Sequence, residues 1–401
     1  MSRRRSVRAG GAALACGLLA SLLAGCGQGG NEVDVEVSAT ASAAPTGSVR
    51  DGEVLFTVDG VPDVVGTVAT GLDTPWGIDF LPDGRAIVTE RDTTRVLLVT
   101  PPEVADGKTA GEGEVVEIGR VPETVPRVEA GLLGVAVSPT FATDRQVYLY
   151  VCTAEDNRVV RAEISKDDKL GAVEPVLTGI PTGNTHDGGR LAFGPDGFLY
   201  IATGEGGDTE LAQRKKSLGG KILRITTDGD PAPGNPFDSP VWSLGHRNVQ
   251  GLAFDSEGSL WASEFGQDDA DELNRIIPGE NYGWPEVEGS GGPKKFTEPQ
   301  LTWGTDEASP SGLAYAGGYL WMASLKGERL WRIKAAGGQV SDPAAYFDGK
   351  RGGDAASPET GYGRLRTVVR DPDGRLWVST SNTDGRGKPG DGDDRILLIE
   401  P

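Results

Sequence analysis

The residue with the clearest chemical potential is His186, one of only two histidines in 401 residues. It lies in the glycine-rich segment GNTHDGGRLAFGPDG (183–197), just ahead of a segment that predicts the first strand of a β-hairpin. Histidine changes charge near neutral pH and is the commonest general base in enzymes. A scarce histidine in a tight loop is therefore a candidate catalyst, with a surface residue of no chemical duty as the alternative.

His186 belongs to a repeat. A short apolar segment, a turn containing Pro, Asp or Gly, and a strand rich in Tyr, Trp and Val recur six times along the chain. The positions that we align, 56 to 61 residues apart, are Phe80, Val137, Phe193, Phe254, Ala314 and Arg370. A period of this length with several strands per repeat predicts an all-β, six-bladed β-propeller with about four antiparallel strands per blade.

Charged residues precede several of these aligned positions by four to eight residues. They are Glu129, His186, Arg247, Arg364 and Arg366. In a propeller, the segments that lead into the same hairpin of successive blades surround one end of the central channel. Because arginine binds carboxylates in bidentate fashion, the pattern predicts a site for an anionic ligand with a base beside it. Polar residues that merely cap the strands are the alternative.

A second candidate site is the acidic segment SEFGQDDADELN (263–274), which follows the fourth repeat. Four carboxylates fall within five residues: Asp268, Asp269, Asp271 and Glu272. Carboxylates this dense repel one another unless a hard cation gathers them, and Ca²⁺ binds six to eight oxygens, backbone carbonyls included. The spacing is not that of an EF-hand, so a solvated acidic turn is an equal alternative. Two histidines leave no cluster for zinc.

The charge balance excludes several functions. With 39 basic and 59 acidic residues the formal net charge is −20, and loss of residues 1–25, which contain four arginines and no acids, would make it −24. A surface this acidic excludes nucleic acid as a partner, because phosphates need a cationic surface, and argues against direct binding to anionic lipid. The sequence also lacks a glycine-rich dinucleotide motif and a P-loop.

The first 52 residues predict export and anchoring. Residues 1–25 combine four arginines with an apolar run (12–24) too short to span a bilayer, as in a signal peptide. LAGC (23–26) resembles the bacterial lipobox, which implies an extracytoplasmic, cell-surface lipoprotein held to the membrane only by lipid on Cys26. An ordinary secretory signal is the alternative. Residues 26–52, mainly small and acidic, predict a flexible tether, and residues 53–401 the propeller. Cys152 is the only other thiol outside residues 1–25, so no disulfide forms within the body.

Several long segments resemble one family, the soluble pyrroloquinoline quinone (PQQ) sugar dehydrogenases, which include glucose/sorbosone and aldose sugar dehydrogenases. They are GLDTPWGIDFLPDG, EAGLLGVAVSP, NTHDGGRLAFGPDG, SLGHRNVQGLAFD, DELNRIIPGENYGWP, SLKGERLWRIK and GYGRLRTVVRDPDG. The resemblance runs from about Gly66 to Glu400. It implies a six-bladed propeller that uses PQQ and Ca²⁺ to oxidise the anomeric hydroxyl group of aldoses to lactones, and that passes electrons to a quinone or another acceptor instead of NAD.

The resemblance also implies roles for single residues. His186 matches the catalytic base, and Arg247 matches the arginine that holds the reacting quinone oxygen. The further matches to cofactor contacts are Asn248, Lys326, Arg364 and Arg366, and Glu129 is expected at the same site.

Metal ligands follow from the resemblance in the same way. Gly266 and Gln267 match positions whose carbonyls bind the Ca²⁺ on PQQ, and Asp271 matches an acidic residue nearby. Glu272 and Tyr282 match ligands of a separate structural Ca²⁺, the tyrosine through its carbonyl.

Some positions depart from the family pattern. Thr185 stands where the glucose enzyme has an acidic residue before its histidine, so Asp187 becomes a candidate to orient the ring. Glu129 replaces a glutamine, Gln267 replaces a proline, and Phe265 replaces a polar residue. A broad range of aldoses is therefore the expectation, instead of glucose alone.

Two other functions compete with this one. Glu129 and Thr185 also suit a non-catalytic propeller that binds sugar or protein at the cell surface. A propeller lactonase ranks last, because it would need acidic residues where this chain mostly has arginines. The oligomeric state does not follow from the sequence.

Overall fold

The computed structural model describes residues 60–349 and 361–401. The predicted signal peptide, Cys26 and the tether lie outside the described residues. No helix in the described part of the chain is long and apolar enough to cross a membrane.

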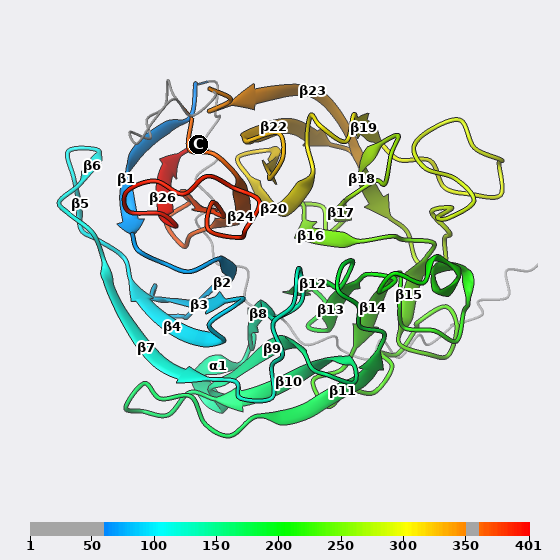
Figure 1. The fold of residues 1–401 in the computed structure, drawn as a ribbon, viewed down its shortest axis with the longest axis horizontal. Coiled ribbons are helices and arrows are strands. Elements are labelled where there is room, and N and C mark those ends of the chain that lie inside the picture. Colours follow the sequence, from blue (N-terminus) through cyan, green and yellow to red (C-terminus); the bar gives the residue numbers. More distant parts are fainter. Residues whose placement is uncertain (1–59, 350–360) are drawn as a thin grey trace, which may run out of the picture. The chain divides into compact units, whose positions relative to one another are not determined.

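Six four-stranded antiparallel sheets follow one another around a central channel, which confirms the predicted six-bladed β-propeller (Figure 1). From the channel outwards, blade one contains β2 (Pro75–Phe80), β3 (Ala86–Glu90), β4 (Arg95–Thr100) and β7 (Glu114–Arg120). Blade two contains β8 (Leu132–Val137), β9 (Gln146–Cys152), β10 (Asn157–Glu163) and β11 (Glu174–Ile180). Blade three contains β12 (Gly188–Phe193), β13 (Leu199–Thr203), β14 (Lys221–Ile225) and β15 (Val241–Leu244).

The other three blades repeat this order. Blade four contains β16 (Val249–Phe254), β17 (Leu260–Glu264), β18 (Asp271–Ile276) and β19 (Leu301–Trp303). Blade five contains β20 (Pro310–Ala316), β21 (Tyr319–Ser324), β22 (Arg329–Ala336) and β23 (Gln339–Tyr346). Blade six contains β24 (Leu365–Arg370), β25 (Leu376–Thr380), β26 (Ile396–Glu400) and β1 (Asp63–Ala69). Outside the blades lie the small pair β5 (Val104–Ala105) and β6 (Lys108–Thr109), helix α1 (Phe141–Asp144) and a 3₁₀ turn (Thr209–Gln213).

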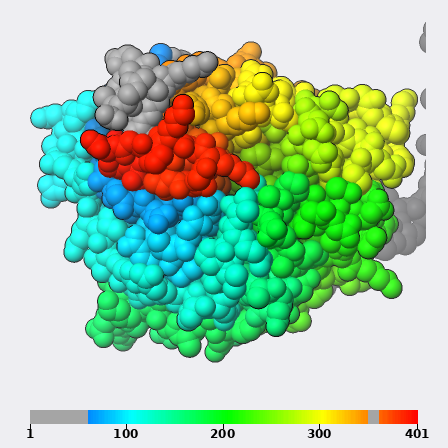
Figure 2. Space-filling view, in the orientation of Figure 1, coloured from blue at the N-terminus to red at the C-terminus, as the bar shows by residue number. Residues whose placement is uncertain are grey.

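The ring is closed by strands from both ends of the described chain. β1 pairs antiparallel with β26, from Asp63 opposite Glu400 to Ala69 opposite Ile396. In the space-filling view the first described segment accordingly lies beside the C-terminal one (Figure 2). The N-terminal strand β1 thus supplies the outer edge of blade six and completes its four strands.

The aligned positions fall at the ends of the innermost strands, with one correction. Five of them are the last residues of β2, β8, β12, β16 and β24. In blade five, Leu313 pairs with Met322 as Leu191 pairs with Ile201, so Tyr315 and not Ala314 is equivalent to Phe193. The shift arises from a tighter hairpin: Gly317 and Gly318 both have positive φ, which permits a two-residue turn.

The blades pack through a repeated small-to-large pairing. On the second strands, Trp261, Trp321 and Trp377 are at most 1% exposed. Small inner-strand residues, Ala253 and Ala314, lie opposite the first two. A small residue on one strand leaves room for an indole on the next, and truncating such a buried aromatic costs about 3–5 kcal/mol.

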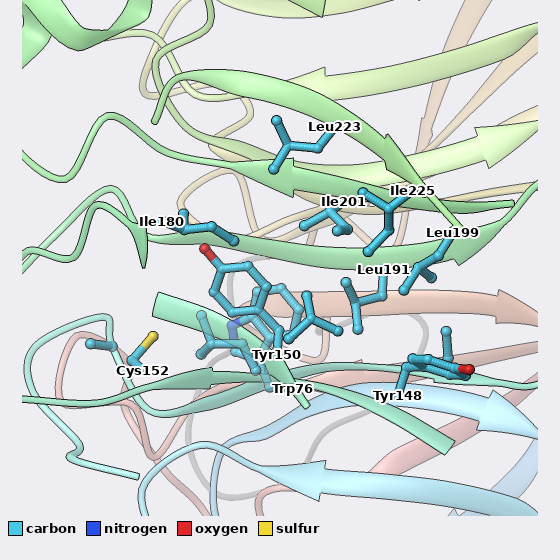
Figure 3. Close-up of a cluster of buried hydrophobic side chains, with 14 of the residues drawn as sticks. Trp76, Tyr148, Tyr150, Cys152, Ile180, Leu191, Leu199, Ile201, Leu223 and Ile225 are labelled. Atoms are coloured by element: carbon cyan, nitrogen blue, oxygen red, sulfur yellow. The ribbon is translucent and has the colours of Figure 1, made fainter. Parts of the chain in front are cut away.

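Apolar clusters fill the spaces between neighbouring blades. Figure 3 shows one of these clusters, in which Tyr148 and Tyr150 of blade two face Leu199 and Ile201 of blade three. Cys152, the expected free thiol, is fully buried in the same cluster. The rigid scaffold therefore fixes the six inner strands, and with them the loops at the channel mouth.

Candidate active site

A cavity of about 390 Å³ lies at the end of the channel where the innermost strands begin. All the residues predicted to serve catalysis or cofactor binding line it. Among its walls are two carboxylates, Glu129 and Asp384, and six cationic side chains: Arg91, Arg247, Lys326, Arg364, Arg366 and Arg386. The cavity is therefore strongly cationic inside an acidic protein.

His186 is held with its ring in a fixed orientation at this cavity. Its backbone has φ 62°, a strained left-handed conformation that is uncommon outside glycine and is typical of functional sites. Its Nδ1 lies 2.8 and 2.9 Å from the two carboxylate oxygens of Glu205, which is only 1% exposed. With Nδ1–H donated to Glu205, the other ring nitrogen, Nε2, is the acceptor. No described residue makes a hydrogen bond to Nε2.

Gly204 makes this arrangement possible, because the His186 loop passes directly over it. A Cβ atom at Gly204 would come within 1.8 Å of the His186 carbonyl oxygen. The same loop is closed by a hydrogen bond from the Gly206 N–H to that carbonyl, 2.9 Å long. A glycine at position 204 therefore lets Glu205 reach the imidazole.

Asp187, the sequence candidate for orienting His186, does not do so. Its Oδ1 accepts hydrogen bonds from the Asn157 side chain (2.9 Å) and the Gly183 N–H (3.0 Å), and the residue is 1% exposed. The backbone at His186 turns so sharply that successive side chains point to different sides of the loop. Asp187 braces the loop from behind, and Glu205 takes the expected orienting role.

Arg247 and Asn248 face the cavity from the segment before β16. Among the described residues, the buried Nε of Arg247 has no hydrogen-bond partner, and its Nη1 donates to the Phe265 carbonyl, 3.3 Å away. Asn248 accepts the Gly188 N–H at 3.0 Å through Oδ1, which leaves its NH₂ group for a ligand. An unsatisfied buried guanidinium nitrogen is costly, so this wall suits an anion or another acceptor.

Arg364 and Arg366, which flank the start of β24, share one carboxylate. Asp384 Oδ2 lies 3.0 Å from Arg364 Nη2 and 3.3 Å from Arg366 Nη2. Burial, with the nearby charges of Arg91 and Arg364, lowers the pKa of Arg366 to about 10. Two buried guanidinium groups are thus compensated by one negative charge, which leaves an excess of positive charge at the cavity.

A further arginine lies beneath the cavity. Arg190 of β12 extends towards blades one, four and six, where it donates to the Trp76 carbonyl, the Gln250 carbonyl (2.8 Å) and the Thr367 hydroxyl (3.1 Å). Its guanidinium lies 4.2 Å from the ring centroid of Trp76, which lines the cavity. Burial, together with the charge of Arg366, lowers the pKa of Arg190 to about 9. Arg190 links the innermost strands of four blades and adds to the positive potential near the site.

Glu129 reaches the cavity from the segment between blades one and two. Its Oε2 accepts the His186 N–H at 3.0 Å, and its Oε1 pairs with Arg386 at 2.9 Å. Burial would raise the pKa of Glu129, but the His186 N–H and Arg386 outweigh it and hold the pKa below its usual value. Glu129 is therefore ionised and compensated. The two carboxylates at the cavity are each paired with arginine, so they do not form the bare acidic cluster that a lactonase-type metal site needs.

The acidic segment after β17 is folded differently from the expected cation-gathering loop. Gly266 lines the large cavity, whereas Gln267 is exposed and its side chain donates a hydrogen bond to Asp268. Asp271 does not line the large cavity, and its two carboxylate oxygens accept the N–H groups of Gly266 (2.9 Å) and Ser309 (2.6 Å). No three acidic, histidine or cysteine side chains in residues 60–349 and 361–401 converge as a metal site. The carbonyl oxygens of Gly266 and Gln267 accept no hydrogen bond from a described residue, so they fit a cation that is bound mainly by backbone oxygens.

A second, much smaller cavity of about 10 Å³ lies next to this loop. Glu272 and Tyr282, the predicted ligands of the structural Ca²⁺, line it together with Glu264 and Glu288. Burial, then the charges of Glu264 and Glu288, raise the pKa of Glu272 above its usual value. The Tyr282 carbonyl accepts no hydrogen bond from a described residue. A space of ionic size among repelling carboxylates and a free carbonyl is compatible with a bound cation.

The repeat pattern before the innermost strands did not point to several residues that line the cavity. Arg91, Phe265 and Leu325 each directly follow the second strand of their blade. In an antiparallel hairpin the end of the second strand lies beside the start of the first. The first residue after the second strand of each blade could therefore have been predicted to lie at the cavity. Glu205 is the second residue after β13, one position further along the chain.

Comparisons with known proteins agree with this geometry. The sequence model of the Glucose / Sorbosone dehydrogenase family matches residues 72–396. An aldose sugar dehydrogenase of Escherichia coli is 29% identical over 350 residues, covering 78% of this chain and 89% of that protein. A structure of the PQQ-bound aldose sugar dehydrogenase from Streptomyces coelicolor is 54% identical with a TM-score of 0.77, and the match covers 85% of this chain and 98% of that one.

Proposed function

Because the chain belongs to the glucose/sorbosone dehydrogenase family, we propose that it is a PQQ- and Ca²⁺-dependent dehydrogenase that oxidises the anomeric hydroxyl group of aldoses to lactones. One observation carries the proposal. His186, held by Glu205 with Nε2 free, lines the same cavity as six cationic side chains. That combination provides a base beside a receptor for a polyanion.

The residues present fit such a cofactor. Its three carboxylates would be held by Lys326, Arg364 and Arg366, and a carbonyl oxygen by Arg247 and Asn248. The carbonyls of Gly266 and Gln267 would hold Ca²⁺. When bound, the quinone supplies the hydride acceptor and Ca²⁺ withdraws electron density from it. The unpartnered Arg247 Nε and the lowered pKa of Arg366 support this assignment, because both mark positive charge that the protein itself leaves uncompensated.

The contribution of His186 is to remove a proton from the sugar. Its Nε2 would accept the proton of the anomeric hydroxyl group as the C1 hydrogen leaves with its electron pair. Glu205 keeps Nδ1 protonated, so Nε2 presents a lone pair, and its charge stabilises the imidazolium that forms. A positioned general base contributes on the order of 10²–10⁴ to the rate.

Glu129 and Arg386 line the cavity and would offer the sugar one negatively and one positively charged hydrogen-bonding group. Arg386 is half-exposed, and both side chains lie close to His186. Such an adaptable polar wall suits a range of aldoses. The electron acceptor would be a quinone or another non-NAD acceptor, because no dinucleotide motif is present. The chain would be an extracytoplasmic lipoprotein, held to the membrane by lipid on Cys26.

Titration of the purified chain with PQQ tests the proposal, first in Ca²⁺ and then in excess EDTA, with a dye-linked assay on a panel of aldoses. We expect stoichiometric, Ca²⁺-dependent binding and dye reduction with several aldoses. Absence of PQQ binding at micromolar concentrations would reject the dehydrogenase and favour a propeller that binds sugar or protein without catalysis.

A further inference from the structure

The loop that follows β17 is organised around a carboxylate distant in sequence. Glu288 lies in the segment between β18 and β19, and its Oε1 accepts four successive backbone N–H groups. The donors and distances are Gln267 (2.6 Å), Asp268 (3.0 Å), Asp269 (2.9 Å) and Ala270 (3.1 Å). A concave run of N–H groups around one anion is a backbone nest. Hydrogen bonds to an ionised acceptor are roughly twice as strong as neutral ones.

The loop is packed closely onto this carboxylate. A Cβ atom at Gly266 would lie 2.1 Å from the Ala270 carbonyl and 2.5 Å from Glu288 Oε1. The Gly266 N–H donates to Asp271 Oδ1. Two carboxylates thus receive all five N–H groups from Gly266 to Ala270, which fixes the peptide planes of the loop.

The carbonyl oxygens are left free by the same arrangement. With the N–H groups directed at Glu288 and Asp271, the Gly266 and Gln267 carbonyls accept no hydrogen bond from a described residue, and Gly266 lines the large cavity. Backbone carbonyls are among the oxygen ligands that Ca²⁺ binds, and the rigidity of the site helps to set its affinity. Glu288 also lines the small cavity with Glu264 and Glu272, so it lies between the two regions expected to hold cations.

We propose that Glu288 is a positioning residue, which holds residues 266–270 so that the carbonyls of Gly266 and Gln267 remain directed to a divalent cation at the cavity. The inference rests on the proposed function for the identity of that cation. It does not require Glu288 to touch the cofactor, the sugar or the cation at the large cavity.

Three variants of the full chain test the inference. Glu288→Ala removes the acceptor, Glu288→Asp keeps the charge but shortens the reach, and Glu288→Gln keeps an oxygen acceptor without the charge. Glu298→Ala is the matched control, since Glu298 lies in the same segment and accepts only the N–H of Gly291. Two readouts are measured without turnover: amide hydrogen exchange of residues 267–270, and the Ca²⁺ concentration that gives half-maximal PQQ binding.

We expect Glu288→Ala and Glu288→Asp to speed exchange at residues 267–270 at least tenfold and to raise the half-maximal Ca²⁺ concentration at least tenfold. Glu288→Gln should lie between the parent and the alanine variant, because its neutral oxygen accepts weaker hydrogen bonds than the carboxylate, and Glu298→Ala should match the parent. If the alanine variant does not fold, the aspartate variant decides. Faster exchange with unchanged Ca²⁺ dependence would overturn the inference, as would slow exchange in every variant. Failure of the parent itself to bind PQQ would reject the proposed function, a result distinct from these.

Discussion

The two histidines form two similar pairs in neighbouring blades, and their differences show what makes a base. His186 Nδ1 lies 2.8 Å from Glu205, and His246 Nδ1 lies 2.8 Å from Glu264. The Nε2 of His246, however, lies 2.8 Å from the Ser243 hydroxyl. The His246 ring also stacks on Tyr282, 4.7 Å away, and its side chain is fully buried, whereas that of His186 is 20% exposed.

A carboxylate on Nδ1 is therefore not sufficient to identify a catalytic histidine. Both pairs fix the orientation of a ring, but only His186 leaves its second nitrogen free at a cavity. In the His246 pair both ring nitrogens are used inside the protein, and Glu264 additionally accepts the Arg247 N–H. The buried pair, His246–Glu264, is suited to holding Arg247 in place. The open pair, His186–Glu205, reaches the cavity and is suited to exchanging a proton with a ligand.

The largest effect is expected from replacing His186, the general base of the open pair. His186→Gln keeps a polar side chain of similar size but removes the proton acceptor. We expect kcat to fall by about 10²–10⁴, while PQQ binding stays within about threefold. Steady-state dye reduction and PQQ titration check both parts. Activity near that of the parent would place the base elsewhere.

The next effect comes from the orienting carboxylate. Glu205→Gln preserves an acceptor for Nδ1–H but removes the charge that stabilises the imidazolium, so we expect a fall of about 10–100-fold in kcat. Steady-state dye reduction with the aldose panel measures the change. A kcat within about threefold of the parent would contradict the role given to Glu205, and Glu264→Gln in the other pair is the matched control.

Breaking the buried pair should instead affect stability. His246→Gln removes hydrogen bonds from Ser243 and Glu264 in a fully buried place, and each unsatisfied group costs about 1–3 kcal/mol. Thermal unfolding should therefore occur at a lower temperature, with kcat reduced less than tenfold. A loss of kcat as large as that of His186→Gln at unchanged stability would mean that the two histidines act together in catalysis.

The smallest effect is expected at Glu129, which accepts the backbone N–H of His186. The backbone N–H of His246 has a different kind of acceptor. The His186 N–H donates to the Glu129 carboxylate, whereas the His246 N–H donates to the Gly220 carbonyl, 3.1 Å away. Glu129→Gln keeps an acceptor for the His186 N–H but loses the ion pair with Arg386, which is half-exposed. Ion pairs at the surface contribute about 0–1 kcal/mol to stability. We expect kcat within about threefold and a change mainly in KM across the aldose panel. A kcat loss above tenfold would give Glu129 a direct part in the chemistry.

Sequence periodicity predicted the fold well because each repeat carries its own hairpin signals. The turn chemistry and the aromatic second strands of each blade are local properties, so six copies in register specified six blades. The one error, at Ala314, came from a shorter glycine turn that shifted the hairpin by a residue. The grouping of His186 with Arg247, Arg364 and Arg366 was predicted from the same periodicity.

By itself, then, the sequence determined the number of blades and that His186, Arg247, Arg364 and Arg366 lie at one end of the channel, because strand period and turn position are set by neighbouring residues. Only the tertiary structure decided that Glu205, and not the adjacent Asp187, orients His186, and that Glu288 gathers the acidic loop from across a long connection. Those choices depend on the direction of each side chain after strained turns and on contacts between distant segments, which no spacing along the chain encodes.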